Sequence, residues 1–118
     1  MQQSKIVEEF YLILHAISSL TKEIAEIISK PNFNENIDLV AIEDKYAKRK
    51  QKINQLNNIL SSPSGVNLIN NNPKWEEFVL EVDTIERKNI SFFEKKANKA
   101  KIKLADIDKK KNLLIYNE

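Results

Sequence analysis

The sequence contains no cysteine, one histidine and one glycine. Without cysteine there is no disulfide, no thiolate nucleophile and no cysteine-ligated zinc site. Gly65 alone cannot make a glycine-rich phosphate-binding loop, and His15 has no second histidine with which to build a catalytic triad. Leu12 and Ser18 stand three residues from His15, so the Glu-x-x-His pattern of metal-binding bundles is missing as well. We therefore expect a non-enzymatic protein without cofactor or metal.

Long apolar runs are also missing. The longest, residues 10–14, is far shorter than the roughly 20 residues that a membrane-spanning helix needs. Glu8 and Glu9 stand where a signal peptide would carry its apolar core. We therefore expect a cytoplasmic protein without a membrane span.

Proline is scarce, with three residues, while charged residues make up 31% of the chain. Few helix breakers and many charges favour helices over a loop-rich or all-β fold. A chain of 118 residues has room for one hydrophobic core. We expect one all-α domain over residues 1–118, an antiparallel three-helix bundle with a long protruding C-terminal helix.

The first helix is predicted at about residues 4–29, with Ser4 as its N-cap and a stop at Lys30, which precedes Pro31. Its apolar residues recur in steps of three and four, as in a heptad repeat. They are Ile6, Phe10, Ile13, Ile17, Leu20, Ile24 and Ile27. Val7, Leu14 and Ile28 widen this seam into a face that can contact two other helices. Phe33 is expected to fold over the end of the bundle.

The second helix is predicted at about residues 38–61, with Asp38 as its N-cap. Arg49 interrupts its apolar seam. In a structural role, the Arg49 side chain reaches water or pairs with an acid on a facing helix. In a functional role, it contacts an anion or a partner. In the following loop, Val66, Leu68 and Ile69 form either a turn packed against the bundle end or a mobile apolar lid.

The third helix is predicted at about residues 73–116, because Asn72 and Pro73 suit a helix start and no later proline or glycine follows. It would be about 65 Å long, much longer than the other two. Before a stutter at Asn89 the seam is aromatic and β-branched, and after it the seam is thinner, with two alanines, then leucine and isoleucine, and Lys111 where another apolar residue is due. We expect its later part to bind a partner through a stripe of apolar residues, called here the stripe: Phe93, Ala97, Ala100, Leu104, Ile107 and Leu114.

Charge is unevenly distributed although the net charge is only +2. Residues 1–44 hold three lysines and eight acids, giving −5, and residues 45–118 hold sixteen basic residues and nine acids, giving +7. The difference can dock helices within one molecule, or attract an acidic partner or nucleic acid. Nucleic acid is the less favoured partner, because arginine is scarce and no aromatic residue interleaves with the lysines that follow Phe93.

Three features of the chain carry a resemblance: the heptads of the first helix, the Lys/Arg-rich segment at residues 46–56, and the long last helix with Ile85 and Tyr116. In these features the chain resembles the flagellar export chaperones of the FliT and FlgN type. The resemblance spans most of the chain. It implies a cytoplasmic chaperone that masks a helical segment of a secreted subunit with its last helix. The alternatives are a homodimeric coiled-coil scaffold, in which two stripes cover each other, and the less favoured nucleic-acid-binding helical protein.

Overall fold

The computed structural model describes the backbone of residues 2–116 and the side chains of residues 5–101. It contains four helices: α1 (Gln2–Ile28), α2 (Glu35–Leu60), α3 (Gly65–Ile69) and α4 (Pro73–Tyr116). No strand occurs over these described residues, so the all-α class is confirmed. Within the same part of the chain, none of the helices has an apolar stretch long enough to cross a membrane.

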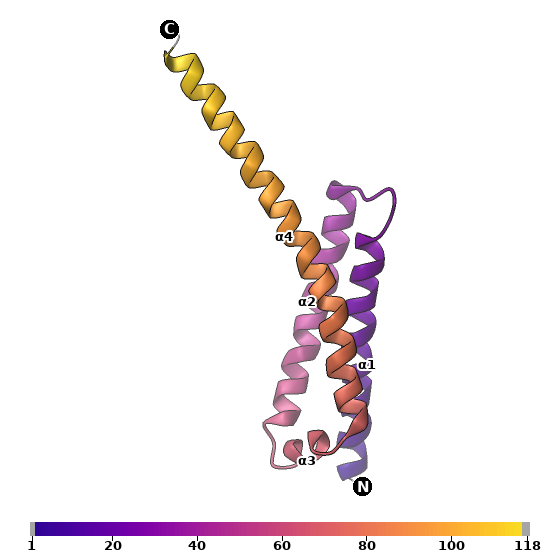
Figure 1. Ribbon diagram of the computed structural model, residues 1–118. Coiled ribbons are helices and arrows are strands. Elements are labelled where there is room, and N and C mark those ends of the chain that lie inside the picture. The colour runs from indigo at the N-terminus through magenta and orange to yellow at the C-terminus, as the bar shows by residue number, and fades with distance from the viewer. Residues whose placement is uncertain (1, 117–118) are drawn as a thin grey trace.

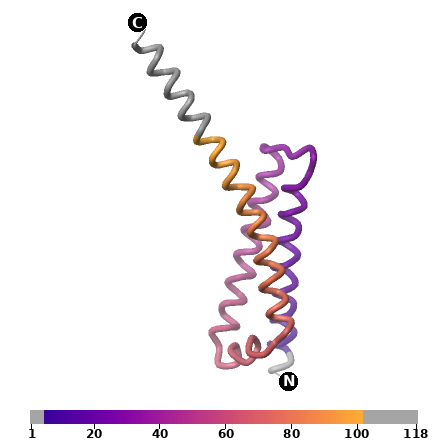
Figure 2. The backbone as a smooth tube through the Cα atoms, viewed as in Figure 1, coloured from indigo at the N-terminus to yellow at the C-terminus, as the bar shows by residue number. Residues whose placement is uncertain are grey.

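The helices form an elongated bundle around α1, with overall extents of 78 × 29 × 21 Å. Helix α1 packs against both α2 and α4. Helix α2 runs antiparallel to α1, and α4 then runs back alongside α1 (Figure 1). Figure 1 shows α4 continuing past the loop that joins α1 to α2, and in the trace of Figure 2 the coloured part of α4 diverges from α1 and α2 towards this loop. The bundle therefore covers the first part of α4 and ends before the helix does.

The predicted seam of α1 forms the core. Phe10, Ile13, Leu14 and Ile17 gather with Leu56 of α2 into a first cluster near the N-terminal end of the bundle. A second cluster, at the opposite end, consists of Ile24, Ile27 and Ile42. Partly buried residues of α4 complete both, with Trp75 and Phe78 in the first cluster and Phe93 in the second. Because α1 supplies six of the eight buried residues of the two clusters, it is the helix on which the other two are assembled.

The start of α2 differs from the sequence prediction. Asn34, not Asp38, is the N-cap, and its side chain accepts a hydrogen bond from the Asn36 N–H at 2.9 Å. Asp38 lies in the first turn, where its Oδ2 accepts the Asn34 N–H at 2.6 Å, and it is 7% exposed. The boundary at residue 38 was wrong because the carboxylate reaches back to the cap instead of starting the helix, and Glu35 and Asn36 become helical.

The loop between α2 and α4 contains α3, a short helix that the sequence did not predict. Leu68 and Ile69 pack against the first cluster, so the packed turn is confirmed in preference to the lid. A Cβ atom at Gly65 would lie 2.5 Å from the Leu60 carbonyl oxygen, which explains why glycine stands here. Asn72 then caps α4, accepting the Lys74 N–H at 3.1 Å and donating to the Tyr11 hydroxyl at 3.0 Å.

Candidate functional site

A layer of polar side chains separates the two apolar clusters. It is formed by residues from all three long helices, and we call it the polar layer: Thr21 of α1, Tyr46 and Arg49 of α2, and Glu86 and Asn89 of α4. Buried polar groups cost free energy unless they are hydrogen-bonded. The contacts of each member therefore decide whether the layer is structural or chemically active.

Arg49 is paired inside the bundle. Its Nη1 donates to Glu86 Oε2 at 2.6 Å, and the two side chains are only 14% and 16% exposed. The Tyr46 hydroxyl donates to the other carboxylate oxygen, Oε1, at 2.9 Å. The Arg49 guanidinium carbon lies 5.5 Å from the centre of the Tyr46 ring, while its buried Nε makes no hydrogen bond. Of the alternatives that the sequence left open for Arg49, the structure thus shows the ion pair with a facing helix.

Tyr46 is held in its neutral form by this arrangement. Burial, the hydrogen bond to Glu86 and the negative charge of that carboxylate together raise the pKa of its hydroxyl to about 12, against a smaller lowering by Arg49. A phenol with this pKa donates a hydrogen bond but does not exchange protons near neutral pH. The layer therefore binds α2 to α4 and does not work as an acid–base site.

Among the described side chains of α4, Asn89 is the most buried polar one, at 1% exposed. Its Nδ2 donates to the backbone oxygen of Thr21 at 3.4 Å, and the Thr21 hydroxyl donates to the Ile17 oxygen at 2.8 Å. A single asparagine in an apolar seam penalises displaced registers, in which its amide would lose its partner. We interpret Asn89 as fixing where α4 lies along α1, and hence how much of α4 extends beyond the bundle.

The point at which α4 leaves the bundle is built from aromatic rings and one ion pair, and we call it the exit site: Phe33, Glu35, Phe92, Phe93 and Lys96. Phe93 faces Tyr46 with ring centres 6.2 Å apart, and Phe92 meets Phe33 edge-on at 5.4 Å. The Lys96 Nζ lies 2.6 Å from Glu35 Oε1 and 4.8 Å from the centre of the Phe33 ring. The contacts at the end of the bundle therefore extend along α4 as far as Lys96.

Beyond Lys96, every described side chain of α4 is exposed, from Ala97 to Lys101. The predicted stripe is accordingly divided. Phe93 packs in the second cluster, whereas Ala97 and Ala100 are in contact with solvent. Leu104, Ile107 and Leu114 lie outside the described side chains. Arg49 belongs to the polar layer and is not brought together with the stripe.

The exit site was found only in part from the sequence. The expectation that Phe33 covers the end of the bundle is confirmed, since Phe33 packs against the second cluster. The pairing of Lys96 with Glu35 does not follow from the predicted second helix, because a helix that starts at residue 38 leaves Glu35 outside it. The sequence did contain a signal for the earlier helix start, because Asn34 is as good an N-cap as Asp38 and would place Glu35 in the first turn.

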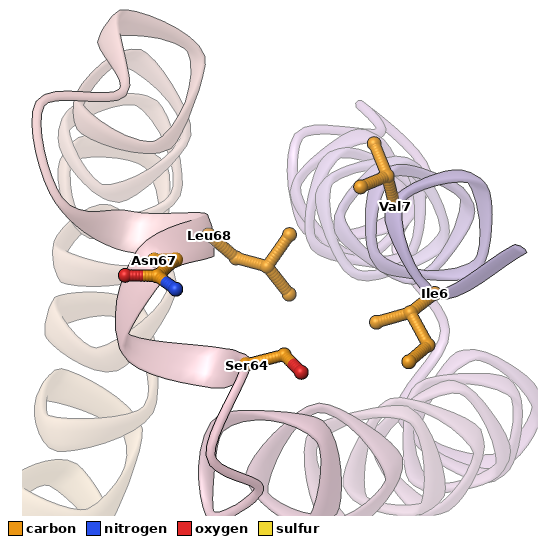
Figure 3. Close-up of a pocket in the computed structure, with 5 residues that line it drawn as sticks. All are labelled: Ile6, Val7, Ser64, Asn67 and Leu68. Carbon is orange, nitrogen blue, oxygen red and sulfur yellow. The ribbon is translucent and has the colours of Figure 1, made fainter. Parts of the chain in front are cut away.

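A hollow of about 290 Å³ lies at the other end of the bundle. Figure 3 shows Ile6 and Val7 of α1 facing Leu68 of α3 across it, with Ser64 and Asn67 beside them. Its size is at the lower limit for small-molecule sites. The lining is apolar with two neutral polar groups, so it suits an apolar side chain or ligand and offers no charge for recognition.

The residues with described side chains contain no arrangement suited to binding a metal: over residues 5–101, no three His, Asp or Glu side chains gather at one point. Comparison of the chain with protein-family models, with curated proteins and with solved structures gives no match. The proposed function is therefore argued from the exit site and the exposed part of α4.

Proposed function

We propose that this protein is a non-enzymatic helical protein-binding module. Its architecture is an antiparallel three-helix bundle from which the C-terminal part of α4 protrudes, and the stripe on that part takes up a helix from a partner. The observation that carries the proposal is the exposure of Ala97 and Ala100 immediately after the exit site. Up to Phe93 the same face of α4 packs against α1, and Tyr46 and Arg49 of α2 also contact it.

The composition of the stripe supports a helix as the ligand. The apolar positions from Phe93 to Ile107 keep the steps of three and four that match the groove of a facing helix. Alanine at positions 97 and 100 lets the backbone of a partner helix approach closely. An extended peptide would gain little here, because α4 offers no free backbone hydrogen-bonding groups along its length.

The resemblance to flagellar export chaperones supports a specific role for such a module. We propose that the protein is a cytoplasmic chaperone or adaptor that masks a helical segment of a secreted subunit of the flagellar type. Covering the apolar face of such a segment would prevent it from associating prematurely with other copies.

The test is Leu104→Asp combined with Ile107→Asp. We expect the bundle to keep its helical circular dichroism and its urea midpoint, and binding of a co-expressed helical segment of a flagellar-type subunit to be lost. The matched control is Ser91→Asp with Asn98→Asp, which adds the same two charges at exposed positions of α4 off the stripe. The control should bind as the wild type does.

Two results would count against the proposal. If the Leu104/Ile107 variant unfolds while the control does not, these residues belong to the core of their own chain. If sedimentation shows a stable dimer that the same variant dissociates, the stripe is covered by a second copy, and the coiled-coil scaffold replaces the chaperone.

A further inference from the structure

One flank of the stripe carries lysine at heptad spacing. Lys96, Lys103 and Lys110 follow one another at intervals of seven residues. Residues seven apart return to nearly the same side of a helix, about 20° away. The corresponding positions on the other flank are Glu94, Lys101 and Asp108, which alternate in charge. The two flanks of the stripe therefore differ in sequence, and only one of them is uniformly basic.

Among the described side chains, the basic flank is represented by Lys96, which lies where a helix of the bundle covers the stripe and forms an ion pair with an acid of that helix. Its Nζ lies 2.6 Å from Glu35 Oε1, in the first turn of α2. Helix α2 packs beside the end of the covered part of α4 and runs antiparallel to it (Figure 1). The helix that covers the stripe at this point thus supplies an acid to the flanking lysine. Beyond Lys96 the bundle ends, while the lysine repeat in the sequence continues for two more heptads.

The charge of the exposed segment disfavours a second copy as the covering helix. Residues 94–101 contain four lysines and one acid, and Lys95, Lys99 and Lys101 are exposed. Two copies of this segment facing each other would bring like charges together, which opposes association. A partner whose flanking residues are acidic would instead gain attraction at each heptad.

We infer that the partner of the stripe is an amphipathic helix of another protein, with acidic residues at seven-residue spacing along one flank of its apolar seam. This inference rests on the proposed function and specifies the chemistry of its ligand. The acids pair with Lys103 and Lys110 as Glu35 pairs with Lys96. The partner helix thereby extends the line of α2 past the end of the bundle and lies antiparallel to α4.

The experiment measures binding of synthetic helical peptides to the full chain by fluorescence anisotropy. The first peptide has a Leu/Ile seam of about three heptads with Glu at one flanking position of each. The second has Gln at those positions and is otherwise identical. At low salt we expect the Glu peptide to bind roughly tenfold more tightly than the Gln peptide, and we expect high salt to remove the difference.

Two charge-reversed variants locate the effect. Lys103→Glu with Lys110→Glu should abolish the preference for the Glu peptide. Lys95→Glu with Lys99→Glu makes the same change in net charge at exposed positions away from the stripe, and it should keep most of the preference. Equal losses in the two variants would overturn the inference, because the attraction would then come from overall charge and not from the flank.

Other outcomes separate this inference from the proposed function. If both peptides bind equally and Leu104→Asp with Ile107→Asp abolishes their binding, the stripe binds helices and the acidic flank is wrong. If neither peptide binds, both proposals fail. A concentration-dependent dimer that excludes the peptides would overturn the inference in favour of a second copy. Duplex DNA would replace the helix as the ligand if it displaces the Glu peptide and if both charge-reversed variants weaken DNA binding equally.

Discussion

Helix α4 has two parts that differ in what covers them. From Trp75 to Lys96 its inner face is packed into both apolar clusters, the polar layer and the exit site. From Ala97 to Lys101 its described side chains are exposed, although the apolar repeat continues in the sequence. The comparison teaches that a heptad repeat specifies which face of a helix is to be covered, but the length of the neighbouring helices decides how much of it the chain covers itself.

The largest expected effect comes from breaking the attachment of the covered part. Glu86→Gln leaves the largely buried Arg49 without its counter-charge. Removing one member of a buried ion pair costs about 3 kcal/mol. We expect the free energy of unfolding, measured by urea titration, to fall by about this amount. A loss below about 0.5 kcal/mol, the usual range for exposed positions, would show that the pair is effectively on the surface.

A smaller effect is expected from the side chain at the boundary between the two parts. Phe93 is partly buried against the second cluster, so Phe93→Ala should lower the free energy of unfolding by about 2 kcal/mol, less than for a fully buried phenylalanine. Ala100→Ser, seven residues further along the exposed part, should change it by less than about 0.5 kcal/mol. Equal effects of the two substitutions would abolish the distinction between the two parts of α4.

The effect that is smallest at neutral pH, because it appears only above pH 10, is a pH dependence confined to the covered part. The pKa of Tyr46 rises from 10.0 to about 12 on folding, so the folded state holds this proton more tightly than the unfolded state does. The resulting stability is fully present below pH 10 and is lost as the pH rises towards 12. Tyr46→Phe should therefore lose less stability than the wild type between these pH values. Identical pH profiles for the two proteins would show that the hydroxyl is solvated.

The sequence was most informative where one periodic pattern extends over many residues. The steps of three and four in α1 identified Phe10, Ile13, Ile17, Ile24 and Ile27 as core, and all are buried. The break in the seam at Arg49 left solvent exposure, an ion pair and an anion or partner contact open, and the structure shows the ion pair. Its partner, Glu86, was not identifiable, because pairing across two helices depends on their relative register.

Local features were harder to predict. Helix α3 has five residues, too few for a recognisable period, and its position depends on the close approach of Gly65 to the end of α2. The start of α2 was misplaced because Asn34 and Asp38 are both good caps, and the contact between them shows which one begins the helix. The residues proposed to bind a partner stay a prediction, and of these only Ala97 and Ala100 have described, exposed side chains.

The central proposal is that a partner covers the stripe beyond Lys96, where the described residues Ala97 and Ala100 are exposed. The absence of cysteine allows a direct test, because Ala100→Cys provides a single thiol on the stripe. We measure its rate of reaction with a soluble maleimide, using Asn98→Cys as the exposed control and Ile17→Cys as the buried one. In the isolated monomer, Ala100→Cys should react about as fast as Asn98→Cys, and the Glu peptide should protect Ala100→Cys alone. Protection of Ala100→Cys in the isolated monomer, at a rate close to that of Ile17→Cys, would contradict the account.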